Sequence, residues 1–284
     1  MEPAERPGNG ANGFRDSVIT ETGLRVRISE AFVEELKLET LAEWCRELWN
    51  AALLEDRERR SPDELHIGRG SVFRCALPSG RCVVLRLCRR GGMIRSVTRY
   101  RFARKLGESW EAVRPFAELS VLEELTRLGL RVPKPVAAAV VPGGLGRTYR
   151  GFVATEEVPA SVNLLRRLAE LRGRPGGGTR ARELCFDAGR QAGAMLAAGI
   201  FHADLHLGNI LVAEEDLTYL IDFDKSCRFP PQQMNRYRER LVRRWKKSVR
   251  KHRVRYPDAL LAADEGFLKG LELGVGSSRG VAKQ

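Results

Sequence analysis

Apolar residues recur with both helical and strand-like spacing in the first third of the chain. Residues 1–16 are mostly polar and rich in Gly and Pro, which predicts a disordered N-terminus. Residues 29–54 carry apolar side chains at helical intervals and are expected to form a helix. The β-forming residues of segment 65–87 are divided by the turn signal Pro78-Ser79-Gly80, so this segment predicts a β-hairpin.

The rest of the pattern moves from strands to helices. A helix is expected over residues 112–128, because its apolar stripe ends before Gly129, a typical helix stop. Further strands are predicted at residues 136–141, 150–156, 210–212 and 219–221, and further helices at residues 161–171 and 184–198. This order indicates an α+β chain of two lobes. We expect an N-lobe with a helical extension, an antiparallel sheet and a helix over residues 17–159, and a mainly helical C-lobe over residues 160–284.

Composition narrows the class of protein further. The 284 residues are 43% hydrophobic, so the chain can bury a core, and they carry a formal net charge of +13. Such a charge attracts polyanions, for example nucleic acid, anionic lipid or a phosphorylated glycan. No apolar run reaches the roughly 18 residues of a membrane-spanning helix, so we expect any work at a membrane to take place on its surface. The six cysteines form no C-x-x-C pair, which favours free thiols in a reducing compartment.

One short segment carries the strongest chemical signal. His202, Asp204 and Asn209 form the pattern H-x-D-x-x-x-x-N, and apolar strands separate it from Asp222-Phe223. A kinase catalytic loop has this arrangement, and its aspartate accepts the proton of the acceptor hydroxyl. Because Mg²⁺ prefers hard oxygen ligands, we assign the base to Asp204 and the metal ligands to Asn209 and Asp222. The alternative is that these residues only cap loops, as Asp and Asn often do.

The segment from His202 to Asp224 resembles the catalytic core of protein-kinase-like phosphotransferases. More narrowly, it is similar to the lipopolysaccharide kinase family, which includes the Kdo kinases and the heptose kinases of the inner core. Supporting segments are Gly68-Arg69-Gly70-Ser71, Val83-Val84-Leu85-Arg86, Arg89-Arg90-Gly91-Gly92, Phe116-Ala117-Glu118, Gly129-Leu130-Arg131-Val132-Pro133-Lys134-Pro135 and the basic stretch from Asn235-Arg236. The R-R-G-G and V-P-K-P segments favour the Kdo-kinase branch.

The resemblance implies an ATP site whose residues lie outside the catalytic segment. Gly68 and Gly70 would turn over the ATP phosphates, although the full G-x-G-x-x-G is absent. Arg86 takes the place of the usual kinase lysine and is expected to pair with Glu118, for which two later glutamates of the same helix are alternatives. Glu156 ends the strand that joins the lobes, and backbone groups there would meet the adenine. The alternative for the two glycines is an ordinary β-turn, and the alternative for the charged residues is a side chain exposed to solvent without a role in binding.

A basic segment near the C-terminus predicts an amphipathic helix. Residues 236–255 carry eleven Lys or Arg and one acid, Glu239, while Leu241, Trp245 and Val249 fall on one side. Such a helix would bind anionic lipid headgroups or the phosphates of lipid A, with Trp245 at the interface. Alternatively, it packs its apolar stripe into the C-lobe and leaves its basic face in solvent.

By resemblance, we expect an ATP- and Mg²⁺-dependent kinase that phosphorylates a sugar hydroxyl of a lipopolysaccharide precursor, with Kdo on Kdo-lipid A as the acceptor. Its expected place is the cytoplasmic face of the bacterial inner membrane, as a peripheral protein. One alternative is a kinase for an inner-core heptose or a protein hydroxyl, and another is a pseudokinase that binds anionic lipid or a protein partner. Nucleic-acid binding is not expected, because no binding motif is present, and the sequence leaves the oligomeric state open.

Overall fold

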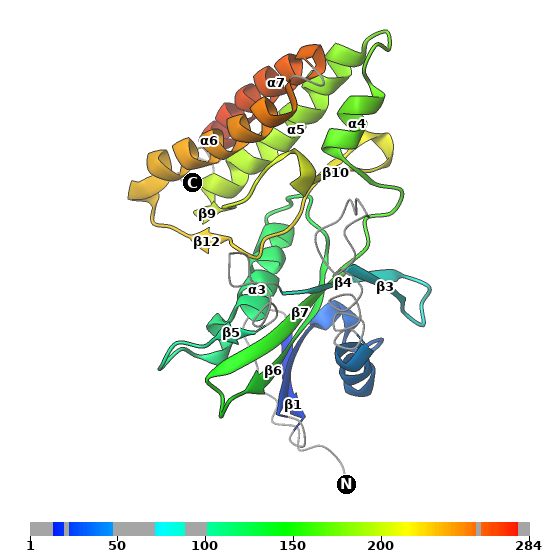
Figure 1. Cartoon of the computed structure of the whole chain (residues 1–284), viewed down its shortest axis with the longest axis vertical. Helices are drawn as coiled ribbons and strands as arrows, with labels where there is room; N and C mark the ends of the chain where they lie inside the picture. Colours follow the sequence, from blue (N-terminus) through cyan, green and yellow to red (C-terminus); the bar gives the residue numbers. More distant parts are fainter. Residues whose placement is uncertain (1–13, 20–22, 48–71, 89–100, 254–256, 278–284) are drawn as a thin grey trace, which may run out of the picture. The chain divides into compact units, whose positions relative to one another are not determined.

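A computed structural model of the chain describes residues 14–19, 23–47, 72–88, 101–253 and 257–277 (Figure 1). The chain divides into two compact units, of which the first comprises Met1–Ser120 with Lys134–Glu157 and the second Val121–Pro133 with Val158–Gln284. Helix α3 (Arg114–Arg127) is therefore shared between them. The predicted N-lobe, residues 17–159, includes the segment Val121–Pro133, which belongs to the second unit.

The first unit is built on a seven-stranded sheet whose pairings are antiparallel. Its strands are β1 (Phe14–Ile19), β2 (Leu24–Ser29), β3 (Val72–Ala76), β4 (Cys82–Leu87), β5 (Phe102–Ala103), β6 (Pro135–Gly143) and β7 (Thr148–Glu156). They lie in the order β1-β2-β6-β7-β4-β3, with β5 paired to β7. The predicted hairpin is confirmed as β3 and β4, which pair from Val72 with Arg86 to Ala76 with Cys82.

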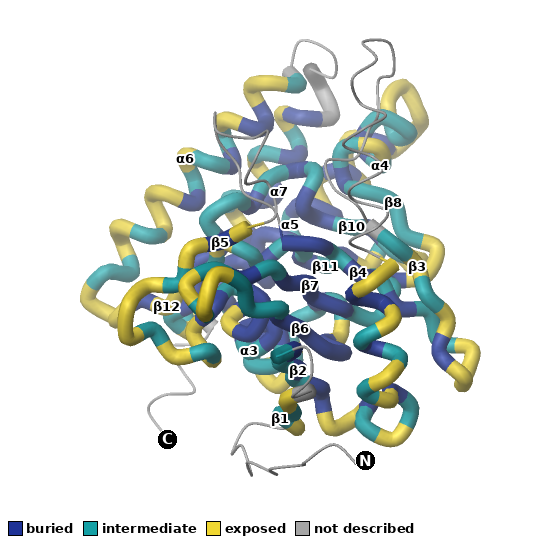
Figure 2. Tube along the Cα trace, turned by 60° about the horizontal axis from the view of Figure 1, so that its bottom comes forward, coloured by how far each residue is buried: buried dark blue, intermediate teal, exposed yellow. Residues whose placement is uncertain are grey.

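Burial in this sheet follows the period of two that the sequence carries. Val83, Leu85 and Leu87 of β4 are buried, whereas Val84 and Arg86 between them are only partly buried. The central strand β6 is buried on both faces from Val136 to Val140, and Figure 2 shows this part of the sheet in dark blue. Each fully buried Val or Leu stabilises the fold by roughly 1.5–3 kcal/mol, so the central strands hold the unit together.

The start of the chain departs from the prediction in two ways. Phe14–Ile19 forms strand β1, although residues up to 16 were expected to be disordered. The expected helix over residues 29–54 is also wrong at its start, because Glu30–Phe32 is a short 3-10 helix and α-helical structure covers only residues 38–47 of the described part. The alternation of Leu24, Val26 and Ile28, all buried, is the strand signal that explains β2 and its partner β1.

The second unit consists of four helices and short strands among the residues that the structure describes. The helices are α4 (Leu164–Glu170), α5 (Gly177–Ala197), α6 (Met234–Arg253) and α7 (Pro257–Ser277). The strands are β8 (Val162–Asn163), β9 (Ile200–Phe201), β10 (Ile210–Val212), β11 (Thr218–Leu220) and β12 (Cys227–Arg228). The two strands expected after the catalytic loop are confirmed as the antiparallel pair β10 and β11. Together the two units confirm the α+β class.

Helices α5 and α7 lie side by side at very short range (Figure 1). A Cβ added at Gly189 or Gly193 of α5 would collide with main-chain carbonyl oxygens of α7. The same holds in the other direction for Gly266, Gly270 and Gly274, which face carbonyl oxygens of α5. Only glycine allows two helix backbones to approach so closely, so these residues are packing positions rather than helix breakers. Helix α7 was not predicted from the sequence.

The apolar stripe of α6 points into the second unit. Leu241 and Trp245 are fully buried and Val249 is nearly so. The Trp245 ring stacks on Phe267 of α7 with 3.8 Å between ring centroids, and its Nε1–H donates to Asp264 at 3.0 Å. The expectation that Trp245 lies at a membrane interface is therefore wrong, because this side chain is a core residue. The basic side of α6 stays exposed (Figure 2).

None of the described helices combines the length and the low polarity that crossing a membrane requires.

Candidate active site

The catalytic segment begins with a histidine that fixes the loop behind Asp204. His202 follows β9 and is buried. The main-chain N–H of Asp204 donates to Nδ1 of His202 at 3.2 Å, so this ring nitrogen is unprotonated. The other ring nitrogen, Nε2, therefore carries the hydrogen and donates it to the carbonyl oxygen of Ile221 at 2.9 Å. Burial lowers the pKa of His202, which keeps the ring neutral. His202 thus connects the loop of Asp204 to the residue just before Asp222.

Asn209 and Asp222 are brought together by the β10–β11 pair. Ile210 lies opposite Leu220, and the ladder continues as the N–H of Ile221 donates to the carbonyl oxygen of Asn209 at 3.1 Å. Asp222 follows directly and has a left-handed backbone, with φ at +68°. A non-glycine residue in this conformation is uncommon and often marks a functional position. This unusual backbone conformation therefore lies at the proposed metal ligand.

The side chain of Asn209 is oriented by the same loop. Its Nδ2 donates to the main-chain carbonyl oxygen of Asp204 at 3.0 Å, and the residue is 8% exposed. This bond commits the amide nitrogen to the protein backbone, so the amide oxygen is the atom that can meet a cation. The structure therefore connects Asp204, Asn209 and Asp222 through the single loop and strand pair that the sequence predicted.

The carboxylate of Asp204 contacts a residue that the sequence did not single out. Nε of Arg244, from α6, donates to Oδ1 of Asp204 at 2.8 Å, and Nη2 of the same side chain lies 2.7 Å from that oxygen as an ion pair. Nζ of Lys225 lies 3.9 Å from the other carboxylate oxygen. Burial alone would raise the pKa of Asp204, but the hydrogen bonds and charge of Arg244 outweigh burial, so the pKa lies below its ordinary value. Asp204 is therefore ionised at neutral pH.

A side chain of helix α6 also binds the backbone of the catalytic loop. The main-chain N–H of Leu207 donates to Oγ of Ser248 at 3.3 Å, and both residues are buried. Next along the loop, the N–H of Gly208 donates to Nδ1 of His206 at 3.0 Å. Burial and the charge of Arg244 lower the pKa of His206, so this ring adds no positive charge at neutral pH. Helix α6, which the sequence predicted from its basic and apolar sides, thus also supports the catalytic loop through Ser248.

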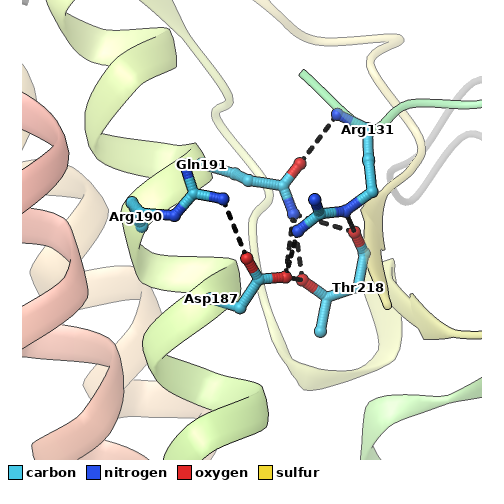
Figure 3. A network of polar contacts seen from close by, with 5 residues as sticks. All are labelled: Arg131, Asp187, Arg190, Gln191 and Thr218. Carbon is cyan, nitrogen blue, oxygen red and sulfur yellow. Dashed lines mark hydrogen bonds and ion pairs between the residues drawn. The ribbon is translucent and has the colours of Figure 1, made fainter. Parts of the chain in front are cut away.

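A polar network holds β11 against α5 (Figure 3). The Oγ1–H of Thr218 donates to Asp187 at 2.5 Å, and Arg131 forms an ion pair with the same carboxylate. Gln191 accepts from the main-chain N–H of Arg131 at 2.8 Å and donates to the carbonyl oxygen of Thr218 at 2.8 Å. The N–H of Leu220 completes the link by donating to the carbonyl oxygen of Arg131 at 3.0 Å. The strand that ends just before Asp222 is therefore fixed by charge-assisted bonds.

In the first unit, the predicted pair of Arg86 and Glu118 is present. Nη2 of Arg86, on β4, donates to Oε1 of Glu118, on α3, and Glu118 is 5% exposed. Glu124, one of the alternatives, pairs instead with Arg228. Because a buried carboxylate is costly without a cation, this pair ties α3 to the sheet.

The other residues predicted to bind the nucleotide are Glu156, Gly68 and Gly70, and the structure does not test their roles. The side chain of Glu156 lies 3.3 Å from Nζ of Lys134 and 3.7 Å from Nη1 of Arg81, and its main-chain N–H donates to the carbonyl oxygen of Lys134 at 2.9 Å. These contacts lie within the first unit, and a role for Glu156 toward adenine stays a prediction. Gly68 and Gly70 lie outside the described residues.

The chain is similar in sequence to known kinases. A profile of the lipopolysaccharide kinase (Kdo/WaaP) family matches residues 56–259. The chain is 31% identical over 195 residues to a 3-deoxy-D-manno-octulosonic acid kinase of Vibrio parahaemolyticus, covering 67% of this chain and 75% of the relative. It is 35% identical over 186 residues to the enzyme of that name from Xanthomonas campestris pv. campestris, covering 66% and 68%. A solved structure, WaaP in complex with acyl carrier protein, is similar with a TM-score of 0.41 and 18% identity, over 74% of this chain and 87% of that one.

Proposed function

The chain belongs to the lipopolysaccharide kinase (Kdo/WaaP) family, and we propose that it phosphorylates a hydroxyl of 3-deoxy-D-manno-octulosonic acid (Kdo) on a Kdo-bearing lipid A precursor. Family membership makes the chain a phosphotransferase that acts on a lipopolysaccharide sugar. We assign ATP as its phosphoryl donor, as for a kinase. Several relatives from different bacteria carry the name of the Kdo kinase, and this supports Kdo as the acceptor.

The observation that carries the proposal is the connection of Asp204, Asn209 and Asp222 through one loop and one strand pair. Asp204 is ionised, because Arg244 lowers its pKa. An ionised carboxylate accepts the proton of the acceptor hydroxyl as the sugar oxygen bonds to the γ-phosphorus. The bond from that phosphorus to the bridging oxygen breaks, and ADP leaves. His202 holds the loop in place for this step without carrying charge itself.

The same residues fit a Mg²⁺ ion. Mg²⁺ that is bound with a nucleotide takes one or two protein carboxylates together with phosphate oxygens. Asp222 would supply the carboxylate and Asn209 the amide oxygen, since the nitrogen of that amide is bonded to the main chain. When bound, the ion neutralises charge on the triphosphate.

Arg86 and Glu118 are the proposed counterparts in the first unit. In a kinase, a cationic side chain on a strand binds the phosphates of ATP, and a carboxylate on a helix orients that cation. Arg86 on β4 and Glu118 on α3 match these two roles. A guanidinium binds phosphate oxygens in a bidentate way, so the charge of the usual lysine is preserved. We also assign the glycines at 68 and 70 and the strand end at Glu156 to the nucleotide.

We assign membrane contact to the exposed side of α6. Of the cations of this helix whose burial the structure describes, seven are exposed: Arg236, Arg238, Arg240, Arg243, Lys247, Arg250 and Lys251. Such a row attracts anionic headgroups, with about 1 kcal/mol for each Lys or Arg near the surface. Because Trp245 is buried, this contact would be electrostatic and would not involve insertion of the aromatic ring. A lipid-linked acceptor would meet the enzyme at the cytoplasmic face of the inner membrane.

The test is a transfer assay with the purified full chain, labelled ATP, Mg²⁺ and a panel of acceptors. The panel contains Kdo-lipid A, lipid A without Kdo, a heptose-bearing inner core and a generic protein substrate. We expect label on Kdo-lipid A, with mass spectrometry placing one phosphate on the Kdo residue. Label on lipid A without Kdo, or only on the heptose-bearing core, would contradict the proposal. ATP binding without transfer to any acceptor would favour a pseudokinase.

A further inference from the structure

Two further carboxylates lie in the same part of the site as Asp204. Asp204, Asp222 and Asp224 all act electrostatically on the ring of His202. An acceptor hydroxyl must approach Asp204 to within hydrogen-bond distance. If the acceptor sugar is an acid, this approach also brings the carboxylate of the sugar to within a few ångströms of the Asp204 carboxylate. Like charges repel at that range, so an acidic sugar needs a cation beside the base.

The structure provides such a cation in Arg244. It contacts Asp204 through a hydrogen bond from Nε and an ion-pair contact from Nη2, and both contacts go to the single oxygen Oδ1. Among the described residues, Nη1 makes no hydrogen bond or ion pair, and the Arg244 side chain is 30% exposed. A guanidinium has five N–H donors in a flat fork, so its free end can bind a second carboxylate while the first stays bound.

The position of Arg244 is fixed by its neighbours on α6. Trp245, the next residue, is fully buried, stacks on Phe267 and donates to Asp264. Ser248, one turn further, accepts a hydrogen bond from the main chain of the catalytic loop. Arg244 therefore belongs to the same rigid part of the unit as Asp204. Arg243 on the same helix is exposed and shares none of these contacts.

Lys225 adds a second positive charge at the other carboxylate oxygen. Its Nζ lies 3.9 Å from Oδ2 of Asp204, and its side chain is 51% exposed. This separation is too long for a hydrogen bond, so Oδ2 remains able to accept one from the acceptor hydroxyl. The base therefore has one oxygen held by Arg244 and the other near Lys225, on a side chain that is 32% exposed.

We infer that Arg244, assisted by Lys225, forms the subsite for the carboxylate of the acceptor sugar, beside the base that takes the hydroxyl proton. This inference rests on the proposed function, because it requires an acidic sugar as the acceptor. In this arrangement Arg244 bridges Asp204 and the sugar carboxylate. It thereby selects an ulosonic acid over a neutral sugar and aligns the reacting hydroxyl with Asp204.

The test crosses two acceptors with three variants. The acceptors are Kdo-lipid A and the same compound with the Kdo carboxylate converted to the carboxamide. The variants are Arg244→Gln, Arg244→Lys and the control Arg243→Gln, each checked for its thermal unfolding. We expect the wild type and Arg243→Gln to prefer the carboxylate in kcat/KM by roughly 10- to 100-fold, as for loss of a charged hydrogen bond. Arg244→Gln should abolish this preference, and Arg244→Lys should keep part of it.

The ratio between the two acceptors separates this role from a purely structural one. If Arg244→Gln lowers kcat/KM for both acceptors by the same factor, Arg244 only positions Asp204 and the inference fails. It also fails if Arg243→Gln removes the preference as completely, because the effect would then come from the overall charge of the helix. A wild type that uses both acceptors equally overturns the subsite but not the kinase. A wild type that phosphorylates neither overturns the proposed function as well.

Discussion

His202 and Ile221 are joined by a hydrogen bond of 2.9 Å from ring Nε2 to a main-chain carbonyl oxygen. Through the other ring nitrogen, the same histidine accepts from the N–H of Asp204. One neutral side chain thus connects the proposed base to the residue that precedes the proposed metal ligand Asp222. The two halves of the site therefore cannot shift independently of each other.

The first prediction concerns pH and His202. Burial lowers the pKa of this ring, so the folded state binds a proton less readily than the unfolded state does. Its contribution to the free energy of unfolding is therefore fully present above the ordinary histidine pKa of about 6.5 and is lost as the pH falls below it. Chemical denaturation of wild type and His202→Gln between pH 5 and 7.5 measures this. The variant should be less stable at pH 7.5 by about 1–3 kcal/mol.

The variant should also depend less on pH than the wild type. A residual dependence is expected, because the pKa of His206 is lowered as well, chiefly by burial. An equal loss of stability with falling pH in both proteins would show that His202 does not carry this effect.

The second prediction concerns the metal. Asp222→Asn removes one negative charge and leaves an amide of the same shape, so the affinity for Mg²⁺-ATP should fall roughly tenfold or more. Isothermal titration calorimetry measures this, and ATP with EDTA instead of Mg²⁺ serves as the control. Binding without metal should not weaken in the variant, because the lost carboxylate repels the metal-free triphosphate. Unchanged affinity for Mg²⁺-ATP would remove Asp222 from the metal site.

The third prediction concerns the ion pair of Arg86 and Glu118. Arg86→Ala takes the cation away from a buried carboxylate, so the free energy of unfolding should fall by on the order of 2–3 kcal/mol and the KM for ATP should rise. Arg86→Lys should restore much of both. The matched control is Arg74→Ala on the neighbouring strand, because the Arg74 side chain that pairs with Glu157 is exposed and its removal should change stability much less. Equal effects of Arg86→Ala and Arg74→Ala on stability would contradict the prediction.

The fourth prediction concerns the contact between α5 and α7. Gly270→Ala places a methyl group against the carbonyl oxygen of Phe186, so the helices must separate, and unfolding should become easier by about 1–3 kcal/mol. Gly276→Ala is the matched control, because in the described part of the chain no atom beyond its own stretch of α7 lies within 4 Å of the added methyl group. There the better helix propensity of alanine should raise stability by up to about 1 kcal/mol. Thermal unfolding in which both variants shift in the same direction would show that α7 does not pack this closely.

The parts of the fold that the sequence predicted are those with local signals. The hairpin of β3 and β4 has a Pro-Ser-Gly turn between two strand-forming runs, and α3 ends before Gly129, whose φ of +73° suits only a few residues. The catalytic loop was predictable because its residues are close in sequence and their types are dictated by the chemistry. The pair of Arg86 and Glu118 followed from the resemblance rather than from any local pattern.

The parts that sequence reasoning missed depend on contacts between distant residues. Helix α7 was not predicted, because Gly266, Gly270 and Gly274 read as helix breakers until α5 is placed against them. Arg244 reaches Asp204 from 40 positions away, and nothing distinguishes it from the other cations of its helix. The same holds for Asp187, which meets Arg131 and Thr218 only in the folded chain.

The proposed role of Asp204 as the base is the centre of this account, and single-turnover phosphoryl transfer by Asp204→Asn tests it most directly. Enzyme in excess is mixed with labelled ATP, Mg²⁺ and Kdo-lipid A, and the affinity for Mg²⁺-ATP is measured in parallel. We predict that the variant binds Mg²⁺-ATP like the wild type and transfers phosphate at least about 10²-fold more slowly, because it lacks the group that accepts the proton. Transfer at a rate within about twofold of the wild type would contradict the account.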